Sequence, residues 1–313
     1  MRVTAVGDAT SLADRKRRAG QRMLLGIAGL TAEGDARRLI AQVGPAGFVL
    51  GPANGEEPAQ LFDLTRELAA LVDPHDPALL AAAVHGGDAP LVAGATRFPS
   101  PRAMARAASG PADVGTAIAR ELRALGFDLN LAPWTEASDD PRAFSARPDG
   151  VAAAVRAFVT AHHAERVAAA VGPVPPGEGP MDALLDALTE ADVGVITVDP
   201  ELGEPGLDAL SLADGLLTGG QRGAELSDQL LHATRAGVDL FLVPTSLDHQ
   251  LEVYEALVRL QEHGADRAAA KSMRRLHAHR ERFFLAAPPR PPMSTVGCPE
   301  HRALASMLAE RYG

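Results

Sequence analysis

Residues 119–138 read ARELRALGFDLNLAPWTEAS and contain one complete helix–strand unit. The first part has the apolar spacing of a helix, and Gly126 follows it where a helix often ends on glycine. Residues 127–132 then form a short apolar run, which is typical of a parallel strand buried on both faces. Trp134 and Glu136 come directly after the run, at its carboxyl end. This order of elements predicts an α/β fold with ligand-contacting side chains after the strand.

The same unit recurs along the chain. Amphipathic stretches alternate with seven further apolar runs, at residues 23–28, 47–51, 79–84, 167–171, 193–198, 215–218 and 238–243. Eight strands that alternate with helices favour a closed (β/α)8 barrel of the TIM type over an open doubly wound sheet. The segment GIAGLTAEG after the first run lacks the G-x-G-x-x-G spacing of a dinucleotide-binding fold.

The barrel is expected to form a single domain with a short C-terminal helical appendage. It is predicted to occupy residues 22–284, after a polar N-terminal extension at residues 1–21. Residues 285–313 contain the proline-rich stretch AAPPRPPM and a final amphipathic segment. We expect this last part to be a linker followed by a terminal helix.

Composition narrows the classes of partner. The chain has 313 residues, of which 46% are hydrophobic, and a net charge of −10, so bulk charge does not favour nucleic acid or anionic membranes. Cys298 is the only cysteine, which excludes an internal disulfide and a cysteine metal cluster. We expect no cofactor and no metal. The first 20 residues show no signal-peptide core, and no apolar run reaches the ~18 residues of a membrane span, which predicts a cytoplasmic protein.

Several segments resemble glycoside hydrolase family 3, in its β-N-acetylhexosaminidase branch. TRFPSPRAMARA is similar to a T-x-F-P-S/P segment of that family, and GFDLNLAPWTEAS to its fourth strand. ATRAGVDLFLVP resembles the eighth strand, and DRAAAKSMRRLHAHRERF the closing helix. The resemblance covers about residues 22–284. It implies a retaining glycosidase reaction, with an Asp nucleophile after strand 7 and a His acid/base on the loop after strand 5.

The catalytic motifs themselves depart from the family. The strand 7 motif reads DGLLTGGQR, which puts Gly220 at the nucleophile position, and glycine has no side chain to attack with. The K-H-F-P-G-H-G-D motif reads GPVPPGEG, with Glu178 near the place of the acid/base His. The resemblance therefore implies a glycosidase lineage with impaired catalysis, retained as a binding or scaffolding protein or as a relic.

Four residues remain as candidates for substrate binding. RAFS replaces the family's R-S-F-G, so Arg142 corresponds to a sugar-contacting arginine, and Glu136 corresponds to the Asp of A-P-V-x-D-V. His85 stands in VHGGD, where the family has D-Q-E-G-G-R. Trp134 either stacks on a sugar ring or fills space left by shortened loops. A carbohydrate is the ligand that the resemblance implies; the sugar and the oligomeric state stay open.

Two other functions remain open. A working hydrolase on a cell-wall-type amino sugar would use replaced carboxylates, for which Glu178 and Asp199 are the candidates. A phosphate- or nucleotide-sugar-binding barrel would use the glycine-rich residues 219–223. Adjacent helical residues point about 100° apart, so His162 and His163 are expected on the surface rather than around a metal ion. The closing-helix histidines, His277 and His279, are expected there too.

Overall fold

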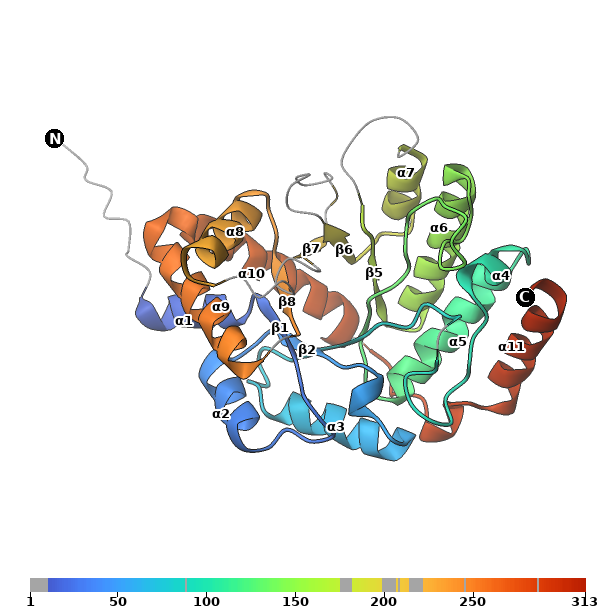
Figure 1. The fold of residues 1–313 in the computed structure, drawn as a ribbon, viewed down its shortest axis with the longest axis horizontal. Helices are drawn as coiled ribbons and strands as arrows, with labels where there is room; N and C mark the ends of the chain where they lie inside the picture. The colour runs from blue at the N-terminus through green and yellow to red at the C-terminus, as the bar shows by residue number, and fades with distance from the viewer. Residues whose placement is uncertain are drawn as a thin grey trace.

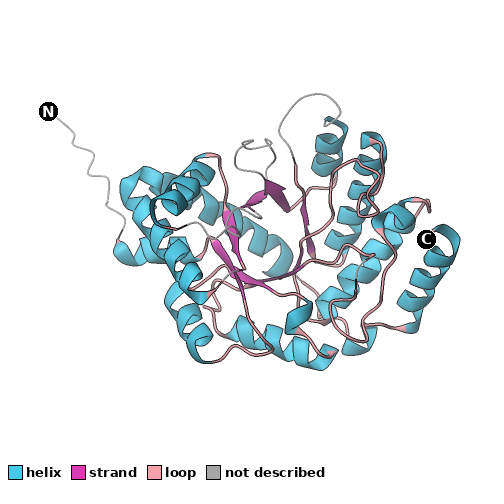
Figure 2. Ribbon diagram, in the orientation of Figure 1, coloured by secondary structure: helices cyan, strands magenta, loops and turns pink. Residues whose placement is uncertain are grey.

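Eight parallel strands form a closed barrel in the computed structural model, with helices around it (Figures 1 and 2). The strands follow chain order, and the last pairs with the first. Their bounds are β1 Met23–Gly26, β2 Gly47–Val49, β3 Leu79–Ala82, β4 Leu129–Asn130, β5 Ala168–Val171, β6 Val195–Val198, β7 Leu210–Ala213 and β8 Leu240–Val243. The structure describes residues 11–87, 89–174, 182–198, 207, 209–213, 222–244, 246–285 and 287–313. The predicted (β/α)8 barrel is confirmed.

The predicted position of the seventh strand is wrong. β7 begins at Leu210, five residues before the predicted run at 215–218, and that run lies outside the described residues. Ser211 interrupts the apolar pattern of β7, although it is buried and its backbone N–H donates to Asp239 Oδ2 at 3.1 Å. A buried polar residue with a partner is compatible with a core strand, but it hides the strand from a search for apolar runs.

The strands divide their side chains between two apolar layers. Leu24, Leu79 and Leu129 belong to a cluster formed mainly by strand residues, as expected for the interior of the barrel. Leu25, the next residue in β1, and Phe48 of β2 belong to the larger cluster that includes the surrounding helices. Burial on both faces explains why the strands read as continuous apolar runs.

Helices lie between most successive strands along the chain, and further helices precede β1 and follow β8. They are α1 Leu12–Gly20, α2 Gly34–Val43, α3 Pro58–Ala70, α4 Pro101–Ala105, α5 Gly110–Ala124, α6 Pro148–Ala164, α7 Asp182–Glu190, α8 Gly223–Arg235, α9 Leu247–Leu260, α10 Asp266–Arg280 and α11 Pro299–Tyr312. Gly126, just after α5, has φ +96°, a conformation that glycine adopts without strain. Among the described residues, no helix combines the length and the apolar character that crossing a bilayer requires.

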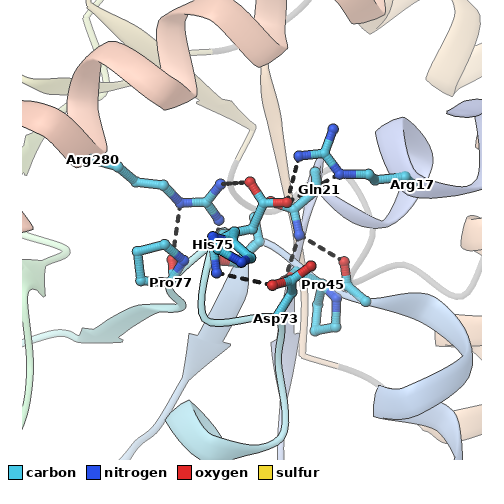
Figure 3. Close-up of polar contacts among 10 residues, drawn as sticks. Arg17, Gln21, Pro45, Asp73, His75, Pro77 and Arg280 are labelled. Carbon is cyan, nitrogen blue, oxygen red and sulfur yellow. Dashed lines mark hydrogen bonds and ion pairs between the residues drawn. The ribbon is translucent and has the colours of Figure 1, made fainter.

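Helix α10 closes the N-terminal end of the barrel. Arg280 donates to Pro77 O at 2.9 Å, just before β3, and Arg275 pairs with Asp239, just before β8, at 3.1 Å. Figure 3 shows Arg280 and Arg17 approaching one carboxylate from opposite sides. It belongs to Asp76, at 3.2 Å from Arg280 and 2.5 Å from Arg17. Because this end is occupied by structural ion pairs, the candidate site lies at the C-terminal end of the strands, where barrel enzymes place their chemistry.

Candidate functional site

The ends of β3 and β4 are joined by the side chain of Asn130. This residue is fully buried, and its Oδ1 accepts a hydrogen bond from Val84 N at 2.9 Å. Its Nδ2 lies 3.0 Å from Val84 O and 3.0 Å from His162 Nε2. A single amide thus positions the backbone immediately before His85.

His162 contacts this amide from α6. The prediction that His162 lies on the surface is wrong. The residue is fully buried, stacks on Phe158 with 4.2 Å between ring centroids, and its Nδ1 lies 3.0 Å from Phe158 O. Burial lowers the pKa of His162 to about 3. The ring is therefore neutral near pH 7, with Nδ1–H donating to the carbonyl and Nε2 accepting from Asn130.

The surface prediction is also wrong for His279, which is buried, whereas His163 is half-buried. Burial lowers the pKa of His163 to about 4 and that of His279 to about 3. Both rings contact Phe283, at centroid distances of 5.1 Å and 4.7 Å. Phe283 lies four residues after His279 on the same helical stretch but 120 residues after His163, so the contact with His163 could not be read from local spacing. His277 alone is exposed as predicted.

His85 lines a cavity beyond the ends of β2 and β3. The cavity has a volume of about 270 Å³, near the lower end of ligand-binding pockets. Its walls include Pro52 and Leu91 together with Thr96 and Phe98, which belong to the segment between β3 and α4. The His85 side chain is half-buried. A cavity of this size and mixed lining suits a ligand no larger than a single sugar ring.

Trp134 and Arg142 are brought together after β4. The guanidinium carbon of Arg142 lies 4.4 Å from the centroid of the Trp134 ring. The guanidinium also pairs with Asp140 through Nε at 3.1 Å and through a second nitrogen at 2.9 Å. These hydrogen bonds from Arg142 lower the pKa of Asp140 to about 2. The backbone of Trp134 forms a bridge with Gly172, which extends the pairing of β4 with β5.

Helix α4 holds the loop that carries Asp140 and Arg142. Arg102 donates its backbone N–H to Pro141 O at 3.2 Å, and its guanidinium donates to Ser138 O. Ser138 N in turn donates to Ser145 O at 3.1 Å. Glu136, in the same loop, is exposed. Arg102 and Asp140 therefore contribute to the site as supporting residues that the sequence did not single out.

Three predicted site residues, Glu178, Asp199 and Gly220, lie outside the described residues. Their assigned roles stay predictions. The strand that precedes Gly220 ends at Ala213, and the next residue in the sequence is Asp214, which is also outside the described residues. Within the described ranges, no three histidine, cysteine, aspartate or glutamate side chains gather in a way that would hold a metal ion.

The beginning of α8 is the described part of the predicted phosphate loop. Gly223 N donates to Glu252 Oε1 at 2.9 Å, and Arg222 pairs with Glu252 Oε2 at 2.5 Å. The hydrogen bond from Gly223 N and the pairing with Arg222 lower the pKa of Glu252. A carboxylate thus already engages Gly223 N and Arg222, the two donors of this loop that lie in the described residues, which counts against the phosphate-binding alternative.

The comparison with protein families decides the lineage. The model of the glycosyl hydrolase family 3 N-terminal domain matches residues 20–183, just over half of the chain. The chain belongs to glycoside hydrolase family 3. This match includes the β4 segment, His85 and the Trp134–Arg142 pair, so the predicted resemblance is confirmed. No match was found among curated proteins.

Solved structures of family 3 proteins share the fold. A β-N-acetylglucosaminidase from Paenibacillus superposes with a TM-score of 0.83 at 23% identity, covering 97% of this chain and 69% of that one. A β-N-acetylhexosaminidase from Beutenbergia cavernae gives 0.73 at 19% identity, with coverage of 87% and 99%. NagZ from Neisseria gonorrhoeae, in complex with N-trifluoroacetyl-D-glucosamine, gives 0.67 at 16% identity, with coverage of 94% and 98%. At these identities the superpositions show that the chain shares the barrel fold of these proteins.

Proposed function

We propose that this family 3 barrel binds a carbohydrate at its C-terminal face and does not hydrolyse it. The Trp134–Arg142 pair carries the proposal, because sugars stack on indole rings and accept hydrogen bonds from guanidinium groups; a sugar bound here would replace Asp140 as a partner of Arg142. The His85 cavity supplies a recess after the neighbouring strand. The ligand of the Neisseria structure, an N-acylated glucosamine analogue, suggests the class of sugar.

The described carboxylates near Trp134 do not suit acid–base catalysis. The retaining reaction that the resemblance implies needs a carboxylate nucleophile and a separate acid that holds a proton near neutral pH. The pKa of Asp140 is lowered to about 2, so this group stays ionised and engaged with Arg142. Glu136 is exposed, where water rather than protein surrounds its carboxylate. These features support binding without turnover.

Hydrolysis is the second candidate, favoured by one observation. Because β7 ends at Ala213, the residue that follows directly in the sequence is a carboxylic acid, Asp214. The resemblance places the family's nucleophile at Gly220, so Asp214 would have to supply the carboxylate from an earlier position of the same motif. Loss of turnover in Asp214→Asn, from a wild-type protein that hydrolyses an aryl N-acetyl-β-glucosaminide, would support this candidate over the binding proposal.

Calorimetric titration with N-acetylglucosamine and with its β-1,4-linked disaccharide tests the binding proposal. We expect wild-type protein to bind, and Arg142→Ala to bind roughly tenfold more weakly because a charge-assisted hydrogen bond is lost. Arg147→Ala is a matched control. Arg147 is also exposed and pairs with a nearby aspartate, Asp149, through Nε at 3.2 Å and a second nitrogen at 2.6 Å. Absence of binding to both sugars, or equal weakening in the two variants, would contradict the proposal.

A further inference from the structure

The C-terminal segment is joined to the barrel through a buried carboxylate on α5. Glu121 is only 4% exposed, and its Oε1 accepts from Gly297 N and from His301 Nδ1, both at 2.9 Å. Thr96 donates to the same carboxylate through its hydroxyl at 2.6 Å and its backbone N–H at 3.1 Å. One side chain therefore connects α11 and the turn before it with the segment between β3 and α4.

Direct contacts reinforce this connection. Arg302 donates to Gly94 O at 3.0 Å. Gly297 has φ +63°, and a Cβ placed on it would lie 2.0 Å from the same oxygen, so its backbone packs directly against Gly94. The rings of His301 and Phe98 are neighbours, with centroids 6.4 Å apart. The C-terminal segment thus contacts Gly94 and Phe98 directly, through Gly297, His301 and Arg302.

Two of the residues held in this way form walls of the His85 cavity. Thr96 and Phe98 both line it, together with residues that follow β2 and β3. The strands fix only one side of the cavity, because residues 89–98 contain no helix or strand. The position of the other side therefore depends on Glu121 and on the C-terminal residues that bind it. In Figure 1, α11 lies beside α4 and α5, outside the ring of barrel helices.

We propose that the C-terminal segment, residues 293–312, is a positioning element for the ligand cavity, and that His301 is its central positioning residue. His301 acts through Glu121 on Thr96 and by ring contact on Phe98. The ligand concerned is the sugar of the proposed function, on which this part of the inference rests. The predicted appendage is thereby assigned a role in completing the binding face.

Hydrogen exchange at residues 91–98 tests the inference without any ligand. Thr96 N–H is a direct reporter, because it donates to Glu121. In His301→Leu we expect exchange in this segment to be about tenfold faster, with barrel strands such as β5 unchanged. His301→Asn keeps a donor near the position of Nδ1 and should restore most of the protection. Arg311→Ala is the control on the same helix, since Arg311 contacts the ring of the neighbouring Tyr312, at 5.3 Å, and not residues 91–98.

A second variant and a binding measurement complete the test. Gly297→Ala should increase exchange in the same segment, because its methyl group would collide with Gly94 O. Where wild type binds N-acetylglucosamine, His301→Leu should weaken the affinity several-fold and Arg311→Ala should not. Unchanged exchange at 91–98 in His301→Leu, faster exchange spread evenly over the barrel, or unchanged sugar affinity would overturn the inference. A wild type that binds no sugar refutes the proposed function instead, and the exchange result still decides whether the segment is positioned.

Discussion

Arg142 stacks on Trp134 while it pairs with Asp140, and the distance from its guanidinium carbon to the indole centroid is 4.4 Å. The chain contains a single tryptophan. Its fluorescence therefore reports on this one position at the C-terminal face, without a background from other indoles.

Replacing Arg142 by alanine should change the fluorescence but hardly affect stability. The Arg142 guanidinium is exposed, and exposed cation–π contacts and ion pairs each contribute about 1 kcal/mol or less. We expect the emission of Trp134 to change in intensity or wavelength, and the free energy of unfolding in urea to fall by less than ~1 kcal/mol. Identical emission spectra for wild type and variant would show that the stacking is absent in solution.

Removing Asn130 should destabilise the barrel strongly. Its amide satisfies Val84 N, Val84 O and His162 Nε2, all of them within 3.0 Å. Each buried group left without a partner costs on the order of 1–3 kcal/mol, so we expect Asn130→Leu to lower the free energy of unfolding by about 3 kcal/mol or more. Urea denaturation measures this.

A double-mutant cycle separates the hydrogen bond from simple loss of packing. If Asn130 and His162 support each other, Asn130→Leu combined with His162→Leu should cost less than the sum of the two single changes. Strict additivity, or a single-variant cost below ~1 kcal/mol, would exclude this role for Asn130.

Stability should fall as the pH is lowered from about 6.5 to 4. Burial lowers the pKa of His162 and His279 to about 3 and that of His163 to about 4, whereas an unfolded histidine titrates near 6.5. Below pH 6.5 the unfolded chain binds protons that the folded chain does not, so the stabilisation is complete above pH 6.5 and is lost on acidification.

Asp128 opposes this trend. Burial raises its pKa from 3.8 to about 6, so between these values the folded state binds a proton that the unfolded state lacks. Its contribution is greatest at low pH and is lost as the pH rises through 6. Between pH 4 and 6 the unfolded state binds about three more protons at the histidines, and the folded state binds about one more at Asp128. The difference of about two protons corresponds to a change in the free energy of unfolding of roughly 2–3 kcal/mol per pH unit. Asp128→Asn should make the acid loss steeper, and unfolding curves that coincide at pH 7.5 and pH 5 would contradict the account.

The sequence was sufficient for the barrel because a buried parallel strand shows as an apolar run. Seven of the eight predicted runs overlap the observed strands. The exception, β7, contains Ser211, a buried polar residue that breaks the apolar run. Periodicity is a local signal, and it misses a strand whose apolar run is interrupted by a buried polar residue.

The site was harder to predict than the fold, again because sequence patterns report only local relationships. The order of motifs identified the family and directed attention to Trp134 and Arg142, which do lie together. His162 is hydrogen-bonded to Asn130, 32 residues away, and the link between His301 and Thr96 runs through Glu121. Such contacts between residues that are far apart in the sequence arise from tertiary packing, and spacing along the chain does not predict them.

The release of aryl alcohol from an aryl N-acetyl-β-glucosaminide is the most direct test of the central claim, a family 3 barrel that binds without hydrolysis. Purified wild-type protein, Glu178→Gln and Asp214→Asn would be assayed side by side at pH 7. We predict no turnover above the level of the two variants, because loss of catalytic groups commonly costs on the order of 10⁴–10⁶ in rate. Robust wild-type turnover that disappears in Asp214→Asn or in Glu178→Gln would contradict the claim.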